Sequence, residues 1–237
     1  EARWLGVYGD PGFRAALKAD LDARRFAVFR GRWDLVQVLR TSRPEHKALE
    51  GASLADLAQK TGKHPVDAWL DLVTADGLDV EFLAGLLNTD EKVVGDLIVH
   101  PLTLITLSDA GAHLSLMCDA GYSSTLLGKW VRGLKRLPLE AAVKRLTHDP
   151  ARVYRIPQRG RLEPGYWADV VVFDPATVDA LPAEWVSDLP AGEPRFISRA
   201  RGVEWSLVNG QPVLERGRVI ERAAGERPGQ VLRRFDA

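Results

Sequence analysis

The chain has 237 residues, of which 46% are hydrophobic and 27% charged, a composition typical of a folded globular protein and not of a disordered one. Its 32 basic and 32 acidic residues balance, so charge indicates neither a nucleic acid nor an anionic membrane as a partner. A single cysteine excludes an internal disulfide framework and favours a reducing, cytoplasmic location, and no apolar run approaches the roughly 20 residues of a membrane-spanning helix.

Helical patterns dominate the first hundred residues. Residues 10–25 begin with Asp-Pro and repeat an apolar residue at every fourth position, which predicts an amphipathic helix. Short apolar runs predict strands at 26–29 and 35–39. Three more helices are expected, each with its own start or stop residues: 53–62, opened by Ser53 with Asp56 and closed by Gly62; 64–77, with Pro65 in its first turn and Gly77 at its end; and 89–100, capped by Thr89.

The stretch LITLSDAGAH, residues 104–113, leads a strand-like run into a small acidic turn. Asp109 follows the expected strand at the end where ligands bind to parallel sheets, and a carboxylate there can bind a metal or exchange a proton with bound water. His113 could donate a hydrogen bond to a substrate. A Ser-Asp pair at a strand end can equally cap the next helix, and a single loop histidine is usually solvated. For Asp109 and for His113, the functional and the structural interpretation therefore both stay open.

The second half of the chain changes from helices to strands. Helices are expected at 123–136 and 137–146, and a short third one follows Asp149-Pro150. The order of helix, strand, acidic turn and helix fits a βα unit of a parallel sheet. Beyond Pro157, strand-like runs alternate with glycine turns, and VNGQPV and ERGR are candidate hairpins. We therefore expect a boundary near residue 157, from an α/β part to an all-β part.

Other residue types that often build active sites carry weaker signals. The remaining four histidines form no H-x-H or HExxH pattern and no cluster with Cys118, so no metal site is recognisable from them and they are expected to be structural: His46, His64, His100 and His148. Cys118 has no apparent partner base and is expected to be a small buried thiol. The seven tryptophans are dispersed, which favours packing roles over a stacking platform.

Several runs together resemble the amidohydrolase superfamily, and within it the N-acyl-D-amino-acid deacylase (D-aminoacylase-like) branch. These runs are SDAGAH, LPLEAAVKRLTHDPARVY, RGRLEPGYWADVVVFDP and SLVNGQPV. The phrase from Gly160 to Asp174, G-x-L-x-P-G-x-x-A-D-x-V-V-x-D, is specific to the small β-domain of the superfamily, and SDAGAH points to the deacylase-like branch. The resemblance is weak before about residue 50 and strong from about residue 85 onward.

The resemblance implies an α/β fold class: the C-terminal part of a (β/α)8 TIM-type barrel, residues 1–157, followed by the C-terminal strands and tail of a small β-sandwich-type domain, residues 158–237. A complete barrel takes about 250 residues. The chain also lacks an initial methionine, and the H-x-H motif of the family has no counterpart in it. We therefore expect the C-terminal portion of a longer enzyme, inactive on its own.

The resemblance also implies a metal-dependent hydrolase that cleaves N-acyl amides of D-amino acids with metal-activated water. The cofactor would be a divalent metal, zinc or a similar ion, most of whose ligands lie outside this chain. Asp109 matches the family aspartate that contacts the metal and shuttles the proton to the leaving amine, and we assign Ser108 and His113 to substrate binding. Two alternatives stay open: a hydantoinase-like cyclic amidase on the same scaffold, and a non-catalytic α/β module that binds a small ligand or a protein.

Overall fold

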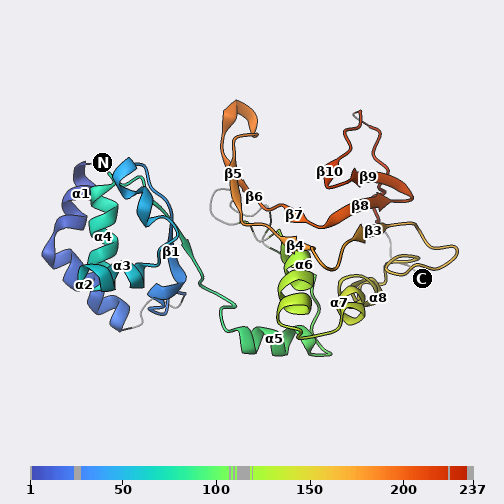
Figure 1. Cartoon of the computed structure of the whole chain (residues 1–237), viewed down its shortest axis with the longest axis horizontal. Helices are drawn as coiled ribbons and strands as arrows, with labels where there is room; N and C mark the ends of the chain where they lie inside the picture. Colours follow the sequence, from blue (N-terminus) through green and yellow to red (C-terminus); the bar gives the residue numbers. More distant parts are fainter. Residues whose placement is uncertain are drawn as a thin grey trace. The chain divides into compact units, whose positions relative to one another are not determined.

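The computed structural model describes residues 2–23, 28–106, 108, 110, 118, 120–223 and 225–233. The chain divides into two compact units, Glu1–Val94 and Gly95–Ala237, each of which is described by itself (Figure 1). Both units combine helices with strands. In the part of the chain that the structure describes, every helix is too short or too polar to cross a membrane.

The first unit packs helices around a small sheet (Figure 1). Two strands, β1 (Val36–Arg40) and β2 (Glu81–Ala84), pair antiparallel. The helical elements are α1 (Ala2–Gly9), α2 (Pro11–Asp22), η1 (Trp33–Leu35), η2 (Pro44–Leu49), α3 (Leu54–Thr61) and α4 (Pro65–Ala75). Helix α5 (Glu91–Val99) crosses the division between the units.

The core of the first unit lies between β1 and helices α3 and α4. Val38 of β1 is 1% exposed and Leu54 of α3 is 0% exposed, and both belong to one cluster with Leu72 of α4. Burial of each such side chain stabilises the fold by about 1.5–3 kcal/mol relative to exposure. Trp33 and Trp69 lie at the edge of this cluster with their ring centroids 6.2 Å apart, which confirms a packing role for these two tryptophans.

Most helices expected in this unit are confirmed, and their ends follow local chemistry. Helix α3 begins with the predicted capping box, in which Ser53 and Asp56 each accept from the other's backbone, and ends at Gly62 in the left-handed region with φ 65°. The predicted cap of α5 was wrong by one residue. The Asp90 side chain accepts hydrogen bonds from the amides of the second and third residues after it. Asp90, and not Thr89, therefore caps the N-terminus of α5.

One predicted strand is wrong where the structure describes it. Of residues 26–29, Val28 and Phe29 form no strand, and the first two residues lie outside the described ranges. Phe29 instead meets Trp33 edge-on, with ring centroids 4.7 Å apart. The ring contact with Trp33 stabilises Phe29 in a stretch that has no partner strand.

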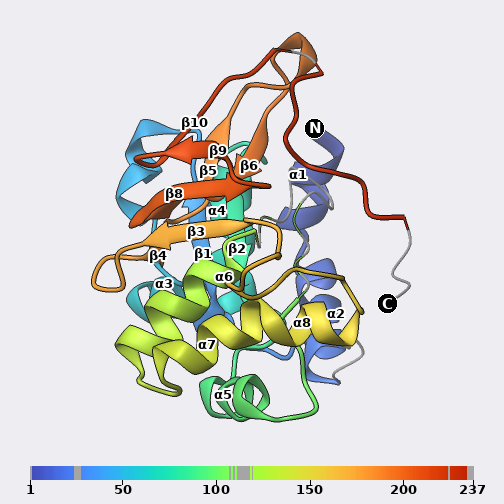
Figure 2. The same ribbon diagram turned by 90° about the vertical axis from the view of Figure 1, so that its right-hand side faces the viewer.

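The second unit joins helices to antiparallel strands (Figure 2). Beyond α5, its described helical elements are α6 (Tyr122–Thr125), a continuing π-helix η3 (Leu126–Gly133), α7 (Leu139–Leu146), α8 (His148–Val153) and the short η4 (Pro190–Gly192). A four-stranded sheet has the order β10-β9-β8-β3, formed by β3 (Val170–Phe173), β8 (Val203–Val208), β9 (Gln211–Glu215) and β10 (Arg218–Val219). Two further pairs are β4 (Asp179–Ala180) with β7 (Ala200–Arg201) and β5 (Glu184–Val186) with β6 (Arg195–Ile197).

Both predicted hairpins are present in the second sheet. Asn209 and Gly210, with φ 50° and 79°, connect β8 to β9, and Arg216 and Gly217, with φ 48° and 73°, connect β9 to β10. Two consecutive positive φ angles are the pattern of the turn that matches the twist of paired strands. Asn-Gly adopts these backbone angles at little energetic cost, which is why the sequence VNGQPV predicts a hairpin.

The strand predicted at 104–107 is not formed by its described residues. Residues 104–106 have no regular secondary structure, and the next residue lies outside the description. All strand pairs among the described residues are antiparallel, and none of them includes residues 104–106. A parallel barrel strand needs hydrogen-bonded neighbours on both edges to be stable. The parallel βα unit is therefore not seen in this part of the chain, and the barrel stays a prediction.

Candidate functional site

The predicted site residues fall in a segment that the structure describes only in part. Asp109 and His113 lie outside the described residues. Ser108 is half-buried, and its hydroxyl oxygen accepts a hydrogen bond from the Ala110 amide, with an N···O distance of 3.3 Å. This contact closes a tight turn directly after residues 104–106. The assignment of Ser108 to substrate binding stays a prediction.

A cavity of about 390 Å³ lies beside this segment, inside the second unit. Ile105 and Thr106 form one wall, and residues of α7 and α8 line another. The cavity is further lined by Tyr122, Tyr154, Ile156, Arg159, Gly160 and Leu232. The segment that leads into Ser108 therefore borders a cavity that is also lined by residues of 122–160 and by Leu232.

Arg159 joins this cavity to the sheet. Its guanidinium forms an ion pair with Asp169 through Nη1 and donates through Nη2 to the Asn209 side-chain oxygen at 3.0 Å. Asp169 in turn accepts from the Asn209 amide at 2.8 Å. The Arg159 side chain is only 12% exposed and lies over the Trp167 ring. These contacts connect the start of the R-G-x-L-x-P-G phrase to the β8–β9 turn. Arg159 and Asp169 therefore have a structural role.

Sequence reasoning did not single out the Arg159–Asp169–Asn209 cluster. The signal was present, because Arg159 directly precedes the recognised phrase, Asp169 lies inside it and Asn209 sits in a predicted hairpin turn. Their pairing joins positions 40 and 50 residues apart. Nothing in local periodicity indicates which distant partners a charged residue will find.

The π-helix η3 contacts the strands at Gly128. A Cβ at Gly128 would overlap the Asp179 carboxylate, so only glycine permits this approach. Arg132, one turn further along η3, donates to the Val178 carbonyl at 2.5 Å and to Asp179 at 2.8 Å. The helix that follows the predicted site segment is thereby fixed to β4.

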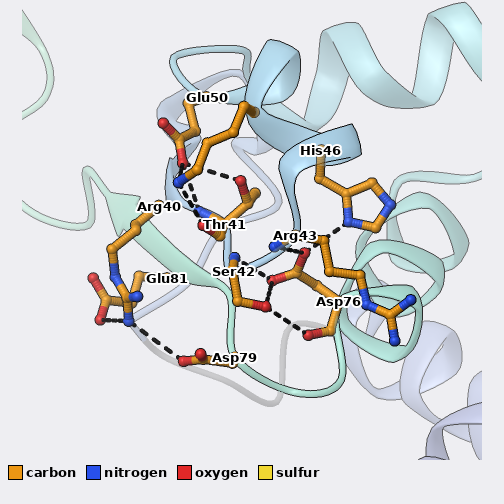
Figure 3. Close-up of polar contacts among 10 residues, drawn as sticks. Arg40, Thr41, Ser42, Arg43, His46, Glu50, Asp76, Asp79 and Glu81 are labelled. Atoms are coloured by element: carbon orange, nitrogen blue, oxygen red, sulfur yellow. Dashed lines mark hydrogen bonds and ion pairs between the residues drawn. The ribbon is translucent and has the colours of Figure 1, made fainter.

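A dense polar cluster of the first unit surrounds Asp76, at the end of α4 (Figure 3). The Asp76 side chain is 0% exposed. Its carboxylate accepts from the Ser42 amide at 2.7 Å, the Ser42 hydroxyl at 2.8 Å and the Arg43 amide at 3.2 Å, and it lies 2.7 Å from His46 Nδ1. Burial raises the pKa of Asp76, but these hydrogen bonds outweigh burial and hold the pKa well below the ordinary value.

Asp76, His46 and Ser42 are the residue types of a hydrolytic triad, but their arrangement is different. In a triad the histidine stands between the acid and the nucleophile and takes the proton of the nucleophile. Here Asp76 is the common partner of both Ser42 and His46 (Figure 3). The serine is bonded to the carboxylate directly, so the cluster anchors the loop after β1 and does not activate Ser42. The structural role expected for His46 is confirmed.

Glu50 holds the other side of the same loop. Its Oε1 accepts from the Thr41 amide at 2.7 Å, from the Thr41 hydroxyl at 3.0 Å and from Lys47 Nζ at 2.7 Å (Figure 3). These hydrogen bonds lower the pKa of Glu50 to about 2. The bond from Lys47 has the largest effect, followed by the bond from the Thr41 amide.

Acid should weaken the contribution of Glu50. A group whose pKa is lowered on folding stabilises the fold above its unfolded pKa, and that contribution is lost as pH falls through the folded pKa. For Glu50 the window runs from 4.5 down to about 2. We expect the stability difference between the parent chain and Glu50→Gln, measured by urea unfolding, to shrink across this window. A difference that stays constant down to pH ~3 would contradict this assignment.

Three further residues considered from the sequence are His64, His100 and Cys118. His64 caps α4 by accepting from the Val66 amide at 3.2 Å, and His100 accepts from the Leu102 amide at the same distance. Cys118 is a free thiol and is half-buried, less covered than expected. Among the described residues, no group of three or more His, Cys, Asp or Glu side chains could hold a metal ion.

Comparison with known proteins identifies similar chains. A family model described as "Amidohydrolase family" matches residues 38–214. The N-acyl-D-glutamate deacylase of Alcaligenes xylosoxydans xylosoxydans is 35% identical over 193 residues, which are 80% of this chain and 35% of that protein. The D-aminoacylase of the same organism is 31% identical over 194 residues, again 80% of this chain and 35% of that protein.

A solved structure gives a similar match. The crystal structure of N-acyl-D-glutamate deacylase from Bordetella bronchiseptica, complexed with zinc and a phosphonate inhibitor, is 26% identical with a TM-score of 0.47. The match covers 93% of this chain and 46% of that chain. This chain therefore spans 35% of the length of the two curated relatives and less than half of this solved structure.

Proposed function

Since this chain belongs to the amidohydrolase family, in its D-aminoacylase branch, we propose that it forms part of a hydrolase that cleaves N-acyl-D-amino acids at the amide bond. One observation carries the proposal: the family match runs from residue 38 to residue 214 and so includes the SDAGAH turn. Because the match covers about a third of each curated relative, the activity is proposed for the full-length protein that contains this chain.

Asp109 is the residue of this chain that we assign to the chemistry. Its carboxylate takes the proton of the attacking water as the C–O bond forms, and delivers that proton to the amine as the C–N bond breaks. The products are a carboxylic acid and a free D-amino acid. Ser108 and His113 are assigned to substrate binding, as donors toward the substrate carboxylate or carbonyl.

A divalent metal, zinc or a similar ion, is part of the proposal, with Asp109 as the ligand from this chain. The described residues do not build a metal centre by themselves, since no three of their His, Cys, Asp or Glu side chains come together. Further ligands must therefore join Asp109, because a catalytic zinc is usually held by three protein ligands.

Removal of the metal should stop the reaction of the full-length protein. We expect turnover of an N-acetyl-D-amino acid to fall to background after dialysis against a chelator, and to return when zinc is added. Thermal unfolding of the dialysed protein serves as the control for loss of fold.

Three outcomes distinguish the proposal from its alternatives. Full activity in metal-free protein of verified metal content would contradict the role of the metal. Turnover of cyclic amides in preference to open N-acyl amino acids would favour a cyclic amidase. Binding of N-acyl-D-amino acids without turnover, in metal-loaded protein, would favour a non-catalytic module.

A further inference from the structure

Asn209 is followed by Gly210, and the two residues form the turn between β8 and β9. Asparagine before glycine deamidates readily, because glycine has no Cβ to shield its backbone nitrogen from the asparagine side chain. The other asparagine of the chain, Asn88, is exposed and precedes Thr89, whose branched side chain shields that nitrogen. The sequence therefore contains one chemically labile amide, at Asn209.

Three hydrogen bonds hold Asn209 in the turn. Its side-chain oxygen accepts from Arg159 Nη2 at 3.0 Å, and its side-chain nitrogen donates to the Pro228 carbonyl at 2.6 Å. Its backbone amide donates to the Asp169 carboxylate at 2.8 Å. Because a guanidinium only donates and a carbonyl only accepts, these partners fix the orientation of the side-chain amide. Asn209 thereby connects the sheet to the C-terminal segment.

The backbone nitrogen of Gly210 is held as well. It donates to the Ala168 carbonyl at 2.8 Å, and Gly210 has a φ of 79°. Deamidation begins when this nitrogen loses its proton and bonds to the side-chain carbonyl carbon of Asn209. The bond to Ala168 must break before that step, and the Asn209 side chain must leave its partners. The folded turn therefore opposes the reaction, and opening of the turn permits it.

The bond to Pro228 is central to the attachment of the C-terminal segment, residues 225–233. Among the described residues, it is the one hydrogen bond that connects this segment to the sheet or its turns. A carboxylate at position 209 would have no donor, so two acceptors would face each other where the hydrogen bond stood. It would also add a negative charge beside Asp169, which already pairs with Arg159.

We propose that Asn209 is a deamidation site that the folded turn protects, and that its conversion to aspartate or isoaspartate releases residues 225–233 from the sheet. In the reaction, the Gly210 nitrogen bonds to Asn209 Cγ and ammonia leaves, which gives a succinimide ring. Water then adds to one ring carbonyl and breaks its bond to nitrogen. One amide and one water become one acid and one ammonia, without oxidation or reduction. The inference is independent of the deacylase activity.

Protection by the fold is tested on the full-length protein in mildly alkaline buffer, either folded or unfolded in guanidinium chloride. Peptide mass spectrometry follows the conversion of Asn209 and Asn88 in the same samples. Asn209 should deamidate roughly tenfold or more faster in the unfolded protein. Asn88, which is exposed in the folded chain, should change much less between the two states. Equal rates for Asn209 in the two states would overturn the protection.

Release of the segment is tested with Asn209→Asp, which is the reaction product, and with Asn209→Gly, which suits the positive φ of the turn and also lacks the donor. Limited proteolysis should remove the C-terminal segment several-fold faster in both variants than in the parent, and at the parental rate in Asn88→Asp. Parental cleavage in folded Asn209→Asp would overturn the release. If Asn209→Asp did not fold, parental cleavage in Asn209→Gly would overturn it instead.

Discussion

Replacement of Asp109 by asparagine in the full-length protein should lower kcat for an N-acyl-D-amino acid by about 10³-fold, with KM little changed. Asparagine keeps the size and one oxygen of the side chain but cannot accept the proton of the attacking water. An interaction needed mainly in the transition state affects kcat and leaves substrate binding largely intact. Steady-state kinetics with D- and L-enantiomers of several N-acetyl amino acids would measure this effect.

A matched control for Asp109→Asn is Asp188→Asn. Asp188 is an exposed aspartate of the second unit that pairs with Arg195 at 2.6 Å. A surface pair of this kind contributes little to stability, so kcat should stay within about twofold of the parent. If Asp109→Asn retained parental kcat in protein of normal metal content, Asp109 could not be the proton shuttle, and the assignment of the chemistry to the SDAGAH turn would fail.

Replacement of Asp76 by alanine should destabilise the first unit by about 3 kcal/mol. The change removes the shared acceptor of the Ser42 amide, the Ser42 hydroxyl and the Arg43 amide, and the partner of His46 (Figure 3). It also leaves a hollow where a fully buried side chain stood. Urea unfolding of the chain, followed by circular dichroism, would measure the loss.

Asp79→Ala is the control for Asp76→Ala, three residues further along the chain. The Asp79 side chain is 63% exposed and lies 3.4 Å from Arg40. Its removal should cost less than about 0.5 kcal/mol. Because the pKa of Asp76 is lowered on folding, the loss in Asp76→Ala should be full above the ordinary pKa of 3.8 and diminish at lower pH. Equal losses in the two variants would show that Asp76 does not anchor the loop.

Short-range features of this protein were predictable because their physical causes lie within a few residues. The Ser53–Asp56 capping box and the left-handed Gly62 set both ends of α3, and Asn209-Gly210 set the hairpin between β8 and β9. Each depends on backbone angles and on hydrogen bonds over three or four positions. The family could also be recognised, because SDAGAH and the Gly160–Asp174 phrase are short runs with distinctive residues.

The same locality explains why part of the site could be proposed and part could not. Asp109 stood out because an acidic, small-residue turn after an apolar run is a local pattern with a known chemical use. Leu232 gave no such sign, since a single leucine in a polar tail carries no periodicity. Only the folded chain shows that Leu232 lines the same cavity as Ile105 and Thr106.

The sequence by itself determined both ends of α3, the hairpin turns and the family of this chain, since each is encoded in contiguous residues. Only the tertiary structure decided that Asp76 is buried under a loop 34 residues away, that Arg159 binds Asn209 across 50 residues, and that residues 104–106 have no strand partner among the described residues. The reason is that burial and long-range pairing depend on which segments meet in space. A polar side chain next to water costs nothing, but once buried it must find a partner, and that partner is supplied by the fold.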